Sequence, residues 1–254
     1  MKITEDALEN IVGECLDNFY KRRLQKLNDL KLKDTLKKKN PYLYRATGSE
    51  KAQDIVEDLL RAFMSSSDEG IFGDAFFEPL AQKVSGGVTS PSPGVDVAIE
   101  TDRAYKAIAV KSGPNVFNAQ SKAKQLDNFM SLRSRLQKLQ KHFDAVVGYG
   151  YGKKVSEANA KKIFRELSGQ VFWENLTGDP EFYLRIIRQM KDRPAIHKPE
   201  YNLAWAKAIN RFTKEFLDDF SLEDGGINWE ILTEFNSGKK KIKERKVKGK
   251  TDKL

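Results

Sequence analysis

Asp96 and Lys111 are the residues whose types and places in the sequence point most directly to a chemical reaction. Asp96 interrupts the alternating run of Val95, Val97 and Ile99, where aspartate is disfavoured. Lys111 ends an apolar strand, and a lysine in such a place needs an anionic neighbour. An acid and a lysine at the same end of a hairpin can hold a divalent metal and a phosphate together. The two residues therefore predict a site for phosphate chemistry.

A β-hairpin is predicted to bring these two side chains together. Both flanking runs alternate with the two-residue period of strands, and the short polar segment Thr101 to Ala104 is expected to form the turn. Pairing by equal distance from a turn centred near Arg103 sets Asp96 opposite Val110, beside Lys111. A helix is predicted to begin a few residues after this hairpin.

Five sequence blocks, in this order, resemble the PD-(D/E)xK nuclease superfamily and, within it, the type II restriction endonucleases of the PmeII kind. A strand aspartate followed by a strand lysine is by itself a weak signal, but five blocks in the order of the family are specific and extend over most of the chain. The blocks are NPYLYRA (Asn40 to Ala46), SSDEGIFGDAFFEPLA (Ser66 to Ala81), the hairpin with KSGPN (Lys111 to Asn115), SGQVFWENLTGD (Ser168 to Asp179) and INWEILTEFNSGK (Ile227 to Lys239).

The resemblance implies an α/β fold with a restriction-endonuclease-like core, in which helices flank a mixed central β-sheet, and with helical extensions at both ends. We expect one nuclease domain over residues 1–238. Its parts are a helical N-terminal part (1–64), a catalytic core (66–190) and a helical C-terminal part (200–237). Residues 239–254 are strongly basic and are expected to form a flexible tail.

The resemblance also implies the roles of individual residues, with two departures from the family pattern. The proline that usually precedes the first acid is missing, and Ala109 replaces the acid two residues before Lys111. Similar enzymes with a small residue there take an acid from the preceding helix, which points to Glu78. The catalytic residues implied are thus Asp96, Lys111 and Glu78. Asp96, Glu78 and the backbone carbonyl of Val110 would bind Mg²⁺, for which Mn²⁺ is expected to substitute.

The residue pattern alone leaves the second acid open. A helix is expected from Ile71 to about Val84, and on it Asp74 and Glu78 are four residues apart and share a face. Glu78 could instead pair with a lysine such as Lys83 or lie at the helix edge. Glu69 and Asp74 are the alternative acids.

Polar and basic residues after the hairpin are candidates for DNA contacts. They follow Lys111 or lie on the first turns of the next helix, near the predicted site. A solvated helix surface explains the glutamine and the lysines equally well. These candidates are Ser112, Asn115, Asn118, Gln120, Lys122 and Lys124.

Other elements follow from hydrophobic periodicity. We predict helices at Thr4 to Leu36 (ended before Pro41), Glu50 to Met64, about Ala119 to Gln140, Pro180 to Met190, Tyr201 to Phe220 and within INWEILTEFN. Further strands are predicted at Phe143 to Tyr149 and Gln170 to Trp173. Phe172 and Trp173 are expected in the core.

Composition limits the classes of function. The chain has 45 Lys and Arg against 36 Asp and Glu, a net charge of +9, which suits a polyanionic partner but also occurs in many other proteins. One cysteine, Cys15, and two histidines make a multi-cysteine or histidine-rich metal site improbable on composition. No apolar run has the length of a membrane span, and we expect no membrane partner and a cytoplasmic location in a prokaryotic cell.

The resemblance implies a type II restriction endonuclease that hydrolyses double-stranded DNA to 5′-phosphates with magnesium. A homodimer matched to a palindromic target is expected, with a DNA methyltransferase as functional but not physical partner. Two alternatives stay open: a repair or junction nuclease of the same fold, and a DNA-binding protein whose catalytic site has decayed. Ala109 supports the second alternative, because alanine cannot bind a metal.

Overall fold

The computed structural model describes residues 3–238 and divides the chain into two compact units. The first contains Met1–Asp29 and Ala62–Ala206, and the second contains Leu30–Arg61 and Lys207–Leu254. The predicted single domain and its three parts stay a prediction. The basic tail predicted at 239–254 lies outside the described residues.

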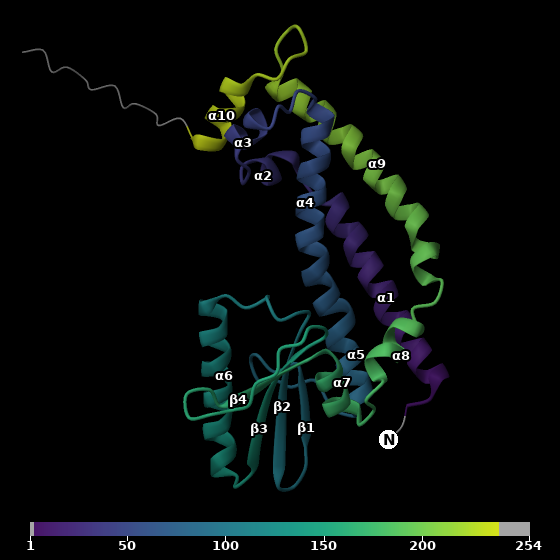
Figure 1. Cartoon of the computed structure of the whole chain (residues 1–254), viewed down its shortest axis with the longest axis vertical. Helices are drawn as coiled ribbons and strands as arrows, with labels where there is room; N and C mark the ends of the chain where they lie inside the picture. Colours follow the sequence, from purple (N-terminus) through teal and green to yellow (C-terminus); the bar gives the residue numbers. More distant parts are fainter. Residues whose placement is uncertain (1–2, 239–254) are drawn as a thin grey trace, which may run out of the picture. The chain divides into compact units, whose positions relative to one another are not determined.

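A four-stranded mixed sheet forms the centre of the first unit (Figure 1). Its strands are β1 (Val97–Glu100), β2 (Ala104–Lys111), β3 (His142–Tyr149) and β4 (Phe164–Ser168), in the order β1-β2-β3-β4. β1 and β2 form the predicted antiparallel hairpin, whereas β2, β3 and β4 are parallel. Parallel neighbours need a crossover connection, and α6 (Ala119–Lys138) provides it between β2 and β3.

Helices cover both faces of this sheet, which confirms the predicted α/β core (Figure 1). On one face, Phe129 and Leu132 of α6 pack against Ala107 of β2 and Ala145 of β3. α6 begins with a capping box at Asn118, close to the predicted start. Its buried stripe is the reason a helix with many lysines still docks on the sheet.

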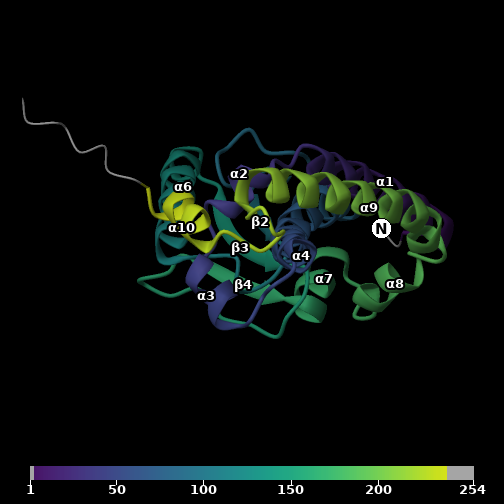
Figure 2. The same cartoon turned by 90° about the horizontal axis from the view of Figure 1, so that it is seen from above.

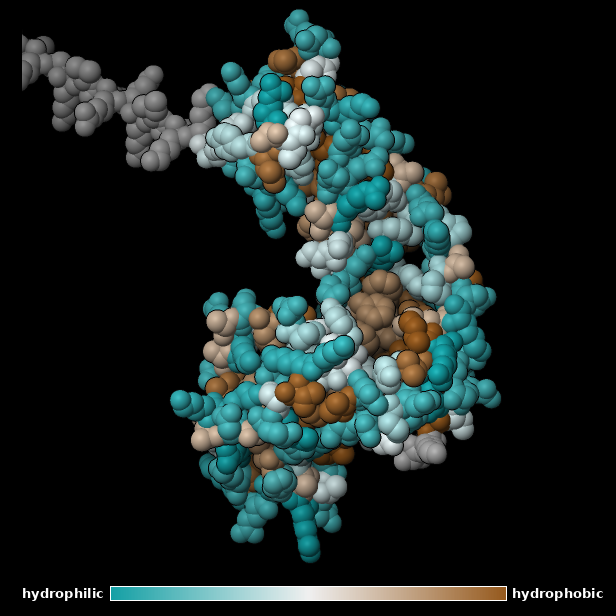
Figure 3. All heavy atoms as spheres, in the orientation of Figure 1, coloured by the Kyte–Doolittle hydropathy of each residue, from teal (hydrophilic) through white to brown (hydrophobic). Residues whose placement is uncertain are grey.

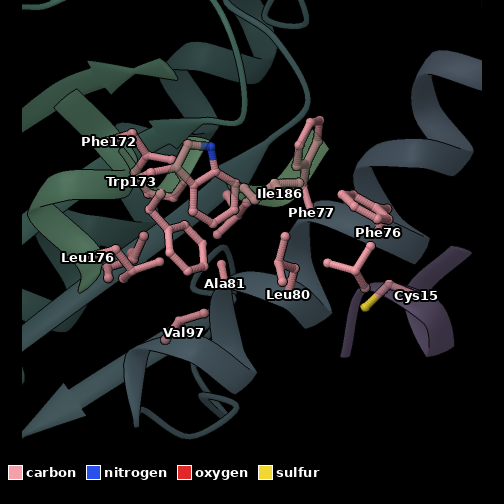
Figure 4. Close-up of a cluster of buried hydrophobic side chains, with 14 of the residues drawn as sticks. Cys15, Phe76, Phe77, Leu80, Ala81, Val97, Phe172, Trp173, Leu176 and Ile186 are labelled. Atoms are coloured by element: carbon pink, nitrogen blue, oxygen red, sulfur yellow. The ribbon is translucent and has the colours of Figure 1, made fainter. Parts of the chain in front are cut away.

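The opposite face carries a larger aromatic core (Figure 4). It is covered by α1 (Glu5–Asn28), the π-helix η1 (Gly73–Phe77), α5 (Glu78–Ser85), α7 (Gly169–Thr177) and α8 (Phe182–Arg188). Phe76, Phe77 and Trp173 are buried there, and the indole Nε1 of Trp173 donates to the carbonyl of Gly150 at 2.9 Å. The prediction that Phe172 and Trp173 belong to the core is confirmed.

α8 lies beside the N-terminal end of α1 in both views of the chain (Figures 1 and 2). Arg185 of α8 joins them: it pairs with Glu5 at 2.8 Å, donates to the carbonyl of Ile3 at 2.9 Å and also pairs with Asp179 at 2.7 Å. The N-terminal segment is therefore held to α8 within the first unit.

The second unit is helical. It contains α2 (Leu32–Leu36), α3 (Pro41–Ala46), α10 (Trp229–Ser237) and parts of α4 (Ala52–Phe72) and α9 (Arg193–Phe220). Asn236 of α10 donates to the carbonyls of Leu36 and Lys39 at 2.8 and 2.7 Å. The predicted short helix in INWEILTEFN is confirmed.

Several predicted boundaries are wrong. The first helix ends at Asn28, because the chain turns before α2 begins at Leu32. Pro41 starts α3 rather than stopping a helix, since proline is tolerated at the first helical position. The helix predicted to end at Met64 continues to Phe72 as α4.

The strand predicted at Gln170 to Trp173 is also wrong, because these residues lie in α7 and the strand precedes them as β4. Phe172 and Trp173 lie on the buried face of α7. The prediction failed because a short apolar run does not distinguish a buried helix from a buried strand. The long predicted helix before the C-terminal region begins earlier than expected, at Arg193, and contains Pro199.

Within the part of the chain that the structure describes, no helix is long and apolar enough to cross a membrane. The face of the sheet-bearing unit seen in Figure 3 is mainly hydrophilic, with small hydrophobic patches.

Candidate active site

Three oxygen atoms surround the ammonium group of Lys111 at the end of β2. Nζ donates to the carbonyl oxygen of Val110 at 2.7 Å and to Oδ2 of Asp96 at 3.3 Å. Oε1 of Glu78 lies 3.8 Å from the same nitrogen. The structure thus brings together the four residues predicted to form the site, although they come from α5, the segment before β1, and β2.

Backbone contacts fix Asp96 at this place. Its N–H donates to the carbonyl of Ile108 at 2.9 Å, and its Oδ2 accepts from the N–H of Val110 at 2.7 Å. The predicted pairing is wrong by one residue: Val97 lies opposite Ile108, so the register sets Asp96 against Ala109. The carboxylate still reaches the predicted neighbours because it extends along the strand to the next N–H.

Gly94 allows the chain to enter the hairpin in this direction. Its φ of +71° lies in the left-handed region, where glycine is favoured because it has no Cβ. Its carbonyl accepts from Nε2 of the buried Gln125 at 2.7 Å. α6 therefore helps to hold the segment that carries Asp96.

Glu78 reaches the site from the opposite side because of an unusual helix. The π-helix η1 ends at Phe77, and Glu78 begins α5 directly after it. A π-helix has i→i+5 hydrogen bonds and therefore wider turns than an α-helix, and such segments are frequent at functional sites. Gly73 in η1 also permits close packing, since a Cβ there would lie 3.3 Å from Cβ of Ser112.

The pKa of Glu78 is raised because this carboxyl group is buried and lies beside a second carboxylate. Burial, followed by repulsion from Asp96, raises the pKa of Glu78 to about 7, although Lys111 acts in the opposite direction. Two carboxylates share a single ammonium here, so the second acid is stabilised in its protonated form.

This donor set fits a magnesium ion. Mg²⁺ prefers oxygen ligands and is commonly bound through one or two carboxylates with several waters. Asp96, Glu78 and the Val110 carbonyl supply three oxygens around one positive charge. Among the described residues, no three His, Cys, Asp or Glu side chains are grouped to hold a metal, so a backbone carbonyl and water would complete the coordination.

The two alternative acids have other partners. Asp74 is exposed and pairs with Arg22 at 3.5 Å. Glu69 accepts from the hydroxyl of Ser112 at 2.6 Å and from that of Tyr151 at 2.9 Å. Glu69 therefore accepts from Ser112, the residue after Lys111, and supports the end of β2, whereas Glu78 faces the ammonium itself.

The predicted DNA-contact residues fall into three groups. Ser112 is buried and bonded to Glu69, and Asn118 accepts from the N–H of Ser121 at 2.8 Å as the cap of α6. Lys122 pairs with Glu166. Asn115, Gln120 and Lys124 are exposed.

Glu166 of β4 is the acid that sequence reasoning missed. It is buried and bonded to Tyr149 and to three lysines. The available signal was weak: an acid between Phe164 and Leu167 in a short segment that also contains Arg165. It was overlooked because the strand was placed after Ser168.

Comparison with known families agrees with this geometry. The family model described as "Type II restriction endonuclease EcoO109I" matches residues 6–198, which include the whole sheet and every residue of the candidate active site. A search of curated proteins gives no match to this chain. The residues that surround Lys111 and the extent of the match lead to one conclusion: the chain belongs to the type II restriction endonuclease EcoO109I family.

Proposed function

We propose that this protein is a site-specific deoxyribonuclease that uses magnesium to hydrolyse phosphodiester bonds in double-stranded DNA and leaves 5′-phosphates. Family membership supports DNA cleavage. The observation that carries the proposal is the convergence of Asp96, Glu78 and the Val110 carbonyl on the Lys111 ammonium. An oxygen-lined site beside a lysine suits a metal bound next to a phosphate.

The residues have distinct roles in this reaction. Asp96, Glu78 and the Val110 carbonyl would hold the magnesium ion, which supplies Lewis-acid stabilisation of the phosphate and lowers the pKa of a bound water. Lys111 orients the attacking water and neutralises a non-bridging phosphate oxygen. The water gives up a proton and its oxygen forms a bond to phosphorus while the bond to the 3′ oxygen breaks. The 3′ oxygen takes up a proton, and the products are a 5′-phosphate and a 3′-hydroxyl.

A two-fold homodimer is part of the proposal, because two identical sites facing a palindromic duplex produce a double-strand break. The resemblance to the PmeII kind would place the enzyme in the cytoplasm of a prokaryotic cell, where a methyltransferase protects the host DNA. No stable complex with that methyltransferase is required.

Digestion of a sequenced viral DNA tests the proposal. The full-length protein with Mg²⁺ or Mn²⁺ is expected to yield discrete fragments whose mapped ends share one sequence and carry 5′-phosphates. Cleavage that depends on a junction or a lesion, and not on a sequence, would support a repair or junction nuclease instead.

Ala109 favours a second function. This residue is fully buried and cannot replace the missing acid, and if Glu78 does not ligate the metal, the single carboxylate of Asp96 would hold it weakly. A decayed enzyme that only binds DNA is the alternative. Duplex binding without cleavage of any plasmid or viral DNA, in either metal, would establish it.

A further inference from the structure

Glu166 holds three lysines around a single carboxylate. Its Oε1 lies 2.6 Å from Nζ of Lys154 and 3.4 Å from Nζ of Lys122, and its Oε2 lies 3.1 Å from Nζ of Lys162. The hydroxyl of Tyr149 donates to Oε1 at 2.8 Å. We call Lys122, Lys154 and Lys162 around Glu166 the lysine cluster.

The lysine cluster has an excess of positive charge. One carboxylate faces three ammonium groups, which leaves a formal charge of +2. The Glu166 side chain is only 3 % exposed, whereas the three lysines are partly exposed. Each ammonium has three donor hydrogens, so donors remain for a further acceptor at the surface.

The lysines are held in defined positions by more than charge. Lys154 lies over the ring of Tyr149 and Lys162 over the ring of Phe164, each with Nζ 5.5 Å from the ring centroid. Such cation–π contacts restrict long side chains. The cluster is therefore an arranged group and not a set of independently solvated lysines.

The cluster lies near the candidate active site. Tyr149, which bonds Glu166, is the residue of β3 that pairs with Lys111 of β2. Glu166 lies on β4, the next strand, and β2, β3 and β4 are adjacent in the sheet (Figure 1). Glu166 is level with Val147 of β3 and Ala109 of β2, two residues before Lys111. Two strand spacings and two residues of strand rise give a separation of about 12 Å, which is roughly the axial rise of three to four nucleotides of one DNA strand.

We propose that the lysine cluster binds a backbone phosphate of duplex DNA a few nucleotides from the bond that is cut, and that Glu166 is the positioning residue that arranges its lysines. The part of this proposal that concerns the cut bond rests on the proposed function. The excess positive charge, the free donors and the distance from Lys111 support it.

Binding of a 30-base-pair mixed-sequence duplex without divalent metal, titrated at several salt concentrations, provides the test. Each phosphate contact contributes about 0.9 to the slope of log K against log salt. Lys154→Ala and Lys162→Ala are expected to reduce the slope by about 0.9 each and to weaken binding several-fold. Lys141→Ala is the matched control, because Lys141 pairs with Glu100 near the opposite end of the sheet, and its slope should not change.

Glu166→Gln separates positioning from charge. This variant removes one negative charge and so raises the net charge of the protein by one. A simple charge effect would therefore tighten DNA binding, whereas dispersal of the three lysines would weaken it. We expect weaker binding. Asp144→Asn adds the same charge elsewhere on the sheet, where Asp144 pairs with Arg165 at 2.7 Å, and should not weaken binding.

The outcomes distinguish this proposal from the nuclease proposal. Unchanged slopes in both lysine variants overturn the phosphate site, even if the protein cuts viral DNA. Reduced slopes in a protein that never cuts DNA keep the phosphate site and overturn only the nuclease function. Circular dichroism checks the fold of each variant, and if Glu166→Gln unfolds, the two lysine variants decide.

Discussion

Two acid–lysine clusters lie on β2 and β4 of this sheet, separated by β3, and have opposite charge ratios. At the end of β2, Asp96 and Glu78 share Lys111, so negative charge is in excess. On β4, Glu166 is shared by three lysines, so positive charge is in excess. The same two residue types therefore favour a cation at one place and an anion at the other.

Burial alone does not explain the difference between their carboxylates. Burial by itself acts to raise the pKa of both Glu78 and Glu166. For Glu166, hydrogen bonds from Lys154, Tyr149 and Lys162 outweigh burial and lower the pKa to about 2, whereas the pKa of Glu78 rises to about 7. The number of donors around each acid decides the direction, which makes the comparison testable.

The largest effect is expected at the cluster with excess negative charge. Asp96→Ala or Lys111→Ala should reduce DNA cleavage by about 10³-fold or more, because each removes charge stabilisation at the reacting phosphate. Single-turnover cleavage of viral DNA measures the loss. Duplex binding should be retained, and a variant that still cuts at the wild-type rate would remove that residue from the mechanism.

The next effect concerns stability at the cluster with excess positive charge. Glu166→Gln should lower the free energy of unfolding at pH 7 by about 3–5 kcal/mol, the usual cost of breaking a buried ion pair. Because the folded pKa is depressed, this stabilisation is present above the unfolded value of 4.5 and is lost as pH falls toward about 2.

Urea unfolding of the wild type and of Glu166→Gln at pH 7 and pH 3 measures this dependence. The difference between the two proteins should shrink at the lower pH. An equal difference at both values would show that charge at Glu166 does not contribute to stability.

Glu78 is expected to behave in the opposite way. Its folded pKa is raised from 4.5 to about 7, so stability present below pH 4.5 is lost as pH rises through 7. Glu78→Gln should therefore stabilise the metal-free protein at pH 8, by on the order of 1–3 kcal/mol, and have little effect at pH 4.

Thermal unfolding in a chelating buffer tests that prediction, while cleavage assays of the same variant should show a large loss. Higher stability with lower activity is the expected signature of an acid retained for metal binding. Full activity in Glu78→Gln would direct the search to Glu69 or Asp74.

The smallest effect is expected outside both clusters. Glu100 forms one exposed pair with Lys141, near the turn of the hairpin. Glu100→Gln should change the free energy of unfolding by less than about 1 kcal/mol and leave cleavage unchanged. A larger change in either measurement would show that a single acid–lysine pair of this sheet also contributes to stability or to cleavage.

The sequence supported prediction best where local pattern and tertiary environment agree. The hairpin follows from period-two alternation around a polar turn, and α6 follows from a cap and a buried stripe. The approach of Asp96 to Lys111 was predictable for the same reason, even with the register wrong by one residue, because the carboxylate extends along the strand to the N–H of Val110 and the ammonium of Lys111.

Prediction failed where a short apolar segment fits two structures. Phe172 and Trp173 are equally compatible with a buried strand and a buried helix, and their assignment to α7 depends on packing against η1 and α8. With the strand misplaced, Glu166 was not seen as a buried acid.

The sequence by itself determined the alternation, the cap and the family blocks, because these depend on residues close together in the chain. The tertiary structure alone decided that Glu78 reaches Lys111 after a π-helix and that lysines from three segments meet Glu166. Glu78 and Lys111, like Lys122 and Glu166, are distant in sequence, and their contacts depend on how helices pack against the sheet, whereas Lys162 is only four residues from Glu166.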